Sequence, residues 1–436
     1  MSISEVYYKT WRHFFPDLPQ WMGQITDGRD PEHHSLYRVR DVIGSGLGLF
    51  LLKEGSRRQF NEDRAEGEFR KNLAGLFHLR DACHGDTLAY FLNKSTVAAV
   101  HRLRVRCAHH LIRQRVLEPY RLVDRYYLLA FDGTGVITFG EKHCEACLTR
   151  KLSHDRTLYY HPVLEAKIVC DNGLVISVGT EFIENTAGQS KQDCELKAFY
   201  RLARRIKKDF PRLEFCMLGD GIYAGEPTFR LCEELHWRYL IVLQDADLPT
   251  VWQEVQSLSP LNTANRLWRY VMVEGEKRRE TYRWTEAISY HGCTVQVLEY
   301  WKPLDDQQTS HWAWITDLRL HEKRIPEIVH CGGRQRWKLE NQGFNTQKNH
   351  GYALEHIYSQ TTQVQKCFYI LMQIAHLLNQ LVELGTLLKT GLTRRTWSLK
   401  GLNKSLSAQI KEKVIPWSDW QATFDNGFQI RLNDSS

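Results

Sequence analysis

Helical spacing of apolar residues dominates the first 122 positions. Apolar side chains recur every three or four residues over 37–52, 66–80 and 97–117. Residues 85–92, which begin with a glycine, have the pattern of a capped helix start. The polar face of 97–117 is mostly arginine and histidine. The pattern therefore predicts a helical N-terminal domain over residues 1–122, with a basic face suited to binding DNA.

Strand-like patterning begins at residue 126. The apolar and aromatic run from Tyr126 stops at Asp132, which Gly133 follows, and this predicts a buried strand with the carboxylate at its end. The runs 157–169 and 174–183 are rich in β-branched and aromatic residues. The Asp-Asn-Gly triplet between them predicts a tight turn, and hence an antiparallel hairpin.

Helix and strand patterns then alternate as far as residue 248. We expect helices over 191–210 and 226–237, and strands over 213–219 and 238–244. Three strands, a helix, a strand, a helix and a strand is the order of a ribonuclease-H-like core, an α/β fold.

In that order the first and fourth strands are neighbours. Asp132 and Asp220, which follow these two strands, would then lie at one edge of the sheet. Taken singly, each Asp-Gly pair would be an ordinary turn. Two carboxylates at one edge predict a shared metal site instead.

The rest of the chain divides by the same patterns. Short alternating segments joined by polar turns predict a β-rich insertion, after which the core resumes and an apolar helix spans 363–388. The expected organisation is a helical N-terminal, DNA-binding domain over 1–122, the first part of the ribonuclease-H-like catalytic core over 123–248, the β-rich insertion over 249–320, the second part of the core over 321–390 and a C-terminal tail over 391–436.

Composition narrows the class of protein. The chain has 436 residues, 42% of them hydrophobic, and its longest apolar run, 42–52, is 11 residues broken by glycines, against about 20 residues needed to cross a bilayer. The sequence opens without a basic-then-apolar leader, and its 11 cysteines are scattered. We therefore expect a cytoplasmic protein with reduced thiols and no membrane partner.

Positive charge is bunched along the chain. The net charge is +7, and arginine and lysine gather within residues 102–115, 201–208 and 334–348. Bunched cations near aromatic residues fit a polyanionic partner, because each cation placed on a phosphate releases condensed counterions. The alternative at each bunch is a solvated helix face.

A third carboxylate would complete a two-metal site for phosphodiester cleavage. The best candidate is Glu340, because a helix over 334–348 would place Arg336, Glu340, Phe344 and Lys348 on one face. On spacing alone, an exposed Arg336–Glu340 ion pair is the simpler reading. The basic residues near Glu340 that would hold DNA phosphates are Arg334, Arg336, Lys338 and Lys348.

Four motifs lead to a family resemblance: Asp132 in Leu-Leu-Ala-Phe-Asp-Gly-Thr, Asp220 in Leu-Gly-Asp-Gly-Ile-Tyr, Trp314-Ile-Thr-Asp-Leu, and Arg336-x3-Glu340. Over residues 126–360 the chain resembles the bacterial insertion-sequence transposases of the DDE type, in particular the group with a Tyr-Arg-Glu-Lys signature and a β-rich insertion in its core. The group's tyrosine and lysine would fall at Gly333 and Gln347, which do not match, and Lys348 follows one step later.

The resemblance implies a DNA transposase. Asp132, Asp220 and Glu340 would bind two Mg²⁺ or Mn²⁺ ions and catalyse hydrolysis at a transposon end, followed by attack of the freed 3′-hydroxyl on target DNA. It also implies double-stranded DNA as partner, a homodimer in synapsis, a nucleoid-associated location and no use of ATP, which agrees with the lack of a Gly-x4-Gly-Lys-Ser/Thr loop. A non-catalytic DNA-binding protein derived from a transposase and a metal-dependent nuclease without strand transfer stay open as alternatives.

A closely spaced cysteine pair, Cys144 and Cys147, follows the first strand, with His154 and His161 downstream. These four residues would close a tetrahedral zinc site that braces the loop between the first two strands. Free cysteines are the alternative.

For some acidic and aromatic residues, a structural role and a functional role are competing interpretations. Asp193 and Glu195 fit the dipole at the start of the helix over 191–210, and we read them as structural. Glu181 and Glu184 are rival metal ligands. The tryptophans that would either stack on unpaired bases or pack in the core are Trp301, Trp312 and Trp314.

Overall fold

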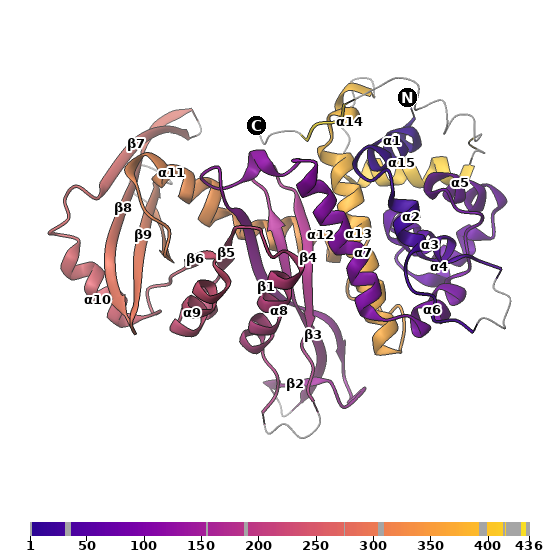
Figure 1. Cartoon of the computed structure of the whole chain (residues 1–436), viewed down its shortest axis with the longest axis horizontal. Helices are drawn as coiled ribbons and strands as arrows, with labels where there is room; N and C mark the ends of the chain where they lie inside the picture. The colour runs from indigo at the N-terminus through magenta and orange to yellow at the C-terminus, as the bar shows by residue number, and fades with distance from the viewer. Residues whose placement is uncertain are drawn as a thin grey trace.

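A mixed sheet runs through the centre and one flank of the molecule (Figure 1). The computed structural model describes residues 2–30, 36–153, 156–186, 191–273, 275–303, 309–391, 399–412, 415 and 429–432. Within these residues the strand order is β2-β3-β1-β5-β6-β10-β9-β8-β7, with β4 paired to β3. The strands are β1 Tyr127–Phe139, β2 Leu148–Lys151, β3 Thr157–Val169, β4 Val175–Phe182, β5 Phe215–Gly219, β6 Arg238–Val242, β7 Arg266–Val273, β8 Glu276–Tyr290, β9 Cys293–Pro303 and β10 Thr309–Thr316.

The centre of this sheet is the set β4-β3-β1-β5-β6. Strands β1, β5 and β6 are parallel, β3 is antiparallel to β1, and β4 is antiparallel to β3. The predicted hairpin is confirmed, and its turn has Gly173 at φ 95°, a left-handed conformation that glycine adopts without a clashing Cβ. The mixed α/β class predicted from the sequence is also confirmed.

Helices cover both faces of the central strands. Helix α8 (Glu195–Asp209) packs on one face, where a Cβ built at Gly179 of β4 would lie 2.8 Å from Leu202. The next residue of β4, Thr180, points to the opposite face, because side chains alternate along a strand. There its hydroxyl accepts a hydrogen bond from Arg104 of α7 (Val97–Arg113), at 2.5 Å. Helix α9 (Glu226–Leu235) connects β5 to β6.

The helical body combines both ends of the chain. Helix α13 packs against α3 and α7, and α15 packs against α1 and α5, so the expected unit over 1–122 shares its core with helices beyond residue 361. The helices of this body are α1 Ile3–Phe14, α2 Leu18–Gly23, α3 Val39–Leu51, α4 Arg57–Arg64, α5 Gly67–Phe77, α6 Gly85–Lys94, α7 Val97–Arg113, α13 Thr362–Leu384, α14 Thr386–Gly391 and α15 Leu399–Glu412. Figure 1 shows α7 and α13 standing between the sheet and the other helices.

Helix α13 forms much of the interface between these helices and the sheet. By length and composition it is the one helix in the described part of the chain that could cross a membrane, but 89% of its most apolar stretch is buried inside the protein. A core helix has the same composition, and its contacts with α3, α7 and β4 show this placement.

A buried polar network joins α7, β3, β4 and α13. Glu165 accepts hydrogen bonds from Ser177 (2.6 Å) and Tyr369 (2.5 Å), and it lies 3.5 Å from the guanidinium of Arg104. Both charged side chains are almost fully buried, at 0% and 3% exposed. A buried charge is tolerated only when paired and hydrogen-bonded, so this network fixes how the helical body sits on the sheet.

The β-rich segment extends the central sheet. Strand β10 pairs antiparallel with β6 through Trp314↔Val242 and with β9 through Trp314↔Leu298. The segment therefore continues the same sheet and does not form a separate one, with α10 (Pro249–Leu258) packed against β8. The left side of Figure 1 shows this extension.

The segment predicted as a regular helix over 334–348 is irregular. It contains a 3-10 turn at Gly333–Gln335, a π-helical stretch at Leu339–Asn345 and a short helix α12 at Thr346–Asn349. Helix α11 (Ile325–Glu327) and a π-helical stretch at Ile328–Gly332 come before it. A Cβ at Gly333 would lie 2.4 Å from the ring of Trp314, so the backbone packs directly on β10. Close packing against the sheet thus overrides the regular helical spacing.

Candidate active site

The edge of the sheet where β1 and β5 part brings two predicted acids together. The parallel pairing of these strands ends at Ala130↔Leu218, and β5 ends at Gly219. Asp220 follows in a tight turn, where its Oδ1 accepts a hydrogen bond from the backbone N–H of Ile222 (3.1 Å). Asp132 lies two residues beyond the last β1–β5 pair, on the same edge.

Strand β1 does not stop at Asp132, so the predicted strand end is wrong. It runs on to Phe139 because β3 continues to pair with it, with Asp132 opposite Glu165 and Phe139 opposite Tyr159. The two glycines of Gly133-Thr134-Gly135 are typical of a turn. Pairing with β3, which is distant in sequence, holds this stretch extended instead. Asp132 is at the edge because β5 ends beside it.

Asp132 lies near three other carboxylates. Burial is the first cause that raises its pKa, which reaches about 6, and the negative charges of Glu195, Asp220 and Glu340 act in the same direction. The guanidinium of Arg336, 3.4 Å from Oδ2, acts in the opposite direction. Asp220 and Glu340 therefore both lie close enough to Asp132 to act on its pKa.

Glu340 is exposed on the π-helical stretch Leu339–Asn345, which contacts β1. The simpler reading of the sequence, an Arg336–Glu340 ion pair, is not found among the described residues. Arg336 is instead buried, 8% exposed, and turned to Asp132. Phe344 packs in the core, 4% exposed, with the ammonium of Lys167 lying 5.5 Å from the centre of its ring.

Glu195, which its place at a helix start predicts to be structural, is a fourth carboxylate of this edge. A Cβ built at Gly133 would lie 2.4 Å from its Oε2, and its Oε1 accepts a hydrogen bond from the hydroxyl of Tyr223 (2.6 Å). Burial and the charge of Asp220 raise the pKa of Glu195. The signal in the sequence was Gly133, since a residue without a side chain next to Asp132 leaves room for another group.

The other basic residues near Glu340 are engaged in contacts within the protein. The ammonium of Lys338 donates to the carbonyl oxygens of Cys170 (3.0 Å) and Asp171, at the β3–β4 turn. Lys348 lies 2.9 Å from Glu355, and the guanidinium of Arg334 lies over the ring of Trp312 at 5.3 Å. Their contact with DNA stays a prediction.

Similar pairing occurs in the basic bunch over 201–208 and at Lys366. Arg201 and Arg205 hold Glu181 at 2.6 and 2.7 Å, and Arg201 also reaches Asp193 at 2.5 Å. Lys366 holds Glu184 at 2.5 Å. The rival ligands Glu181 and Glu184 therefore already have cationic partners, and Asp193 has a structural role, as predicted.

The three tryptophans differ in environment. Trp314 is buried, 1% exposed, and packs in the core. Trp301 stacks on His311 with ring centroids 4.8 Å apart, and Trp312 stacks on Tyr300 at 5.7 Å. Core packing is thus the role of Trp314, and base stacking by the other two stays a prediction.

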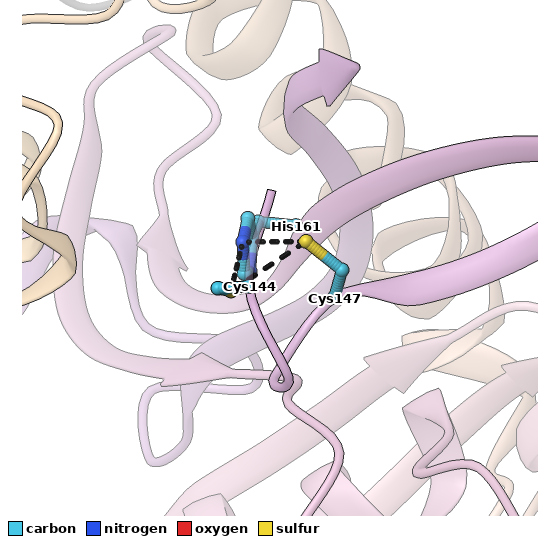
Figure 2. A group of neighbouring side chains, drawn as sticks. All are labelled: Cys144, Cys147 and His161. Carbon is cyan, nitrogen blue, oxygen red and sulfur yellow. Dashed lines mark hydrogen bonds between the residues drawn. The ribbon is translucent and has the colours of Figure 1, made fainter. Parts of the chain in front are cut away.

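A second group of side chains lies on the long β1–β3 hairpin. The sulfurs of Cys144 and Cys147 are 3.5 Å apart, and His161 Nε2 is 3.3 Å from each (Figure 2). Among the described residues, this is the one group of three or more His, Cys, Asp or Glu side chains whose ligand atoms all lie within 4.8 Å of one another. The carboxylates around Asp132 are therefore more widely spaced than these three ligands. His154, the fourth predicted ligand, lies outside the described residues.

Comparison of the chain with protein-family models gave no match, and comparison with curated proteins gave none either. The functional conclusion therefore depends on the residues and their arrangement.

Proposed function

We propose that this chain is a DDE-type DNA transposase whose carboxylates Asp132, Asp220 and Glu340 hold divalent metal ions. The observation that carries the proposal is the gathering of acids from separate segments around Asp132, whose pKa is raised by burial and by these acids. Neighbouring buried carboxylates repel one another, and a bound cation relieves that repulsion. Among the described residues, the guanidinium of Arg336 is the cation paired with Asp132, against three neighbouring acids.

The strand arrangement supports the same proposal. The order β4-β3-β1-β5-β6, with only β3 running opposite to the others, is the arrangement expected of a ribonuclease-H-like core. The β-rich segment enters after β6, where the family resemblance puts an insertion, and Glu340 follows it.

The donor set fits Mg²⁺ or Mn²⁺, which prefer carboxylate oxygens. Bound there, such ions would lower the pKa of an attacking water or 3′-hydroxyl and neutralise charge on the phosphate. The chain's own residues prepare the site. Pairing of β1 with β3 fixes Asp132, and Tyr223 orients Glu195. Arg336 offsets part of the negative charge at Asp132.

The test uses purified protein and DNA taken from both sides of its own gene, with Mg²⁺ or Mn²⁺ present. We expect cleavage at the element ends and joined strand-transfer products. Asp132→Asn, Asp220→Asn and Glu340→Gln should each lower cleavage by about a hundredfold or more while DNA binding persists. The control Glu254→Gln, an exposed acid on α10, should cleave like the wild type.

The alternatives give different outcomes. Cleavage without joined products would indicate a nuclease of the same fold, and binding without cleavage by the wild type would indicate a non-catalytic DNA-binding protein. Undiminished cleavage by Asp220→Asn would show that the acids are wrongly assigned.

A further inference from the structure

We propose that Cys144, Cys147 and His161 bind a zinc ion that ties the loop after β1 to strand β3. The two cysteines lie in that loop, and His161 lies on β3 opposite Ile137 of β1. All three side chains converge on one point in Figure 2. The proposal is independent of the acids at Asp132 and of the activity proposed for them.

The spacing of the three ligand atoms matches a tetrahedral zinc site. With zinc–sulfur bonds of about 2.3 Å and zinc–nitrogen bonds of about 2.0–2.1 Å, tetrahedral angles put two sulfurs about 3.8 Å apart and a sulfur about 3.6 Å from a nitrogen. The distances here are 3.5 Å between the sulfurs and 3.3 Å from each sulfur to Nε2. The ligands thus need to move by only a few tenths of an ångström.

Chemistry distinguishes this group from a disulfide or a magnesium site. A disulfide requires its sulfurs to be about 2.0–2.1 Å apart, well below the observed separation. Two thiolates and an imidazole are soft to borderline ligands, which favour zinc over magnesium. Cys147 is 4% exposed, so it is sheltered from oxidation as structural zinc ligands are.

The ion would brace a segment that leads to the candidate active site. The side chain of Asn185 donates to the carbonyl of Cys147 (2.8 Å), and its Oδ1 accepts from the backbone N–H of Asp193 (3.3 Å). Asp193 lies just before α8, whose first residue is Glu195. These contacts connect the cysteine loop with the start of the helix that carries the fourth acid.

The two sites are nevertheless separate. Asp132 pairs with Glu165 on β3, four residues from His161. At about 3.3–3.4 Å per residue this is roughly 13 Å along the strand. Zinc at the cysteines therefore does not share ligands with the acids.

The test measures metal in the full-length chain, purified under reducing conditions without a histidine tag. Elemental analysis should find about one zinc per chain. Cys144→Ser, Cys147→Ser and His161→Asn should each lose most of this zinc. The matched control Cys194→Ser, at an exposed free cysteine, should keep it.

Cobalt substitution gives a second readout that does not require a folded variant. Replacing zinc by Co²⁺ in the wild-type chain should produce thiolate-to-cobalt charge-transfer absorption and the strong visible bands of tetrahedral cobalt. A wild-type chain that carries no zinc and gives no such bands would overturn the proposal. So would zinc that persists undiminished in all three ligand variants.

Discussion

Replacing Asp132 by asparagine is expected to stabilise the protein at neutral pH. The pKa of Asp132 is raised from 3.8 to about 6, first by burial and then by its acidic neighbours, so its charged form is disfavoured in the folded state. At about 1.4 kcal/mol per pKa unit, the ionised carboxylate lowers the free energy of unfolding by about 3 kcal/mol above pH 6. Asparagine keeps the shape and removes the charge.

The pH dependence follows from the same pKa values. Because the folded pKa is the higher one, the penalty is absent below pH 3.8, where Asp132 is protonated in both states, and it is complete above pH 6. The advantage of Asp132→Asn should therefore be about 3 kcal/mol at pH 7.5 and roughly half of that at pH 5. Partial loss of the contact with Arg336 would make both values smaller.

Urea unfolding followed by circular dichroism, without divalent ions, measures these differences. The exposed Asp245→Asn serves as a control and should change stability by less than about 0.5 kcal/mol at either pH. Adding Mg²⁺ at about ten times its dissociation constant should stabilise the wild type by about 1.4 kcal/mol and the variant less. An Asp132→Asn protein that is no more stable than the wild type, with no dependence on pH, would refute the idea that carboxylates crowd this position.

Two further substitutions test the packing that holds the site. Gly133→Ala places a Cβ 2.4 Å from Oε2 of Glu195 and should lower the free energy of unfolding by about 1–3 kcal/mol. The control Gly135→Ala places a Cβ with no atom within 4 Å and should change the free energy of unfolding little. Urea titrations measure both values. Arg104→Met leaves Glu165 buried without its cation and should lower the free energy of unfolding by about 3–5 kcal/mol. The double variant with Glu165→Gln removes the unpaired charge and should recover part of that loss. A neutral Gly133→Ala, or a double variant less stable than Arg104→Met, would contradict these accounts.

Local patterns were sufficient for most elements of the central sheet. The strand predicted over 157–169 is β3, and the helices predicted over 191–210 and 226–237 contain α8 and α9. The Asp-Asn-Gly turn is predictable because glycine and a two-residue alternation are properties of the nearest neighbours in sequence. The Cys144–Cys147 pair is visible in the sequence for the same reason.

Features set by distant partners were not predictable. The length of β1 depends on β3, and the irregular backbone around Glu340 depends on Trp314 and on β1. Gln347 stands where the family resemblance puts a lysine. It is fully buried, and its side-chain amide donates a hydrogen bond to Gln373 (2.8 Å). None of these contacts leaves a periodic trace in the sequence.

Composition and periodicity are local properties, and they were enough to show which residues can do chemistry and in what order the strands and helices come. Which acids meet depends on how distant segments pack. This packing turns Arg336 to Asp132, brings Glu195 over Gly133 and sets His161 against the two cysteines. The physical reason is that charge, burial and metal affinity depend on distances between segments, and those distances are fixed by packing across the sheet.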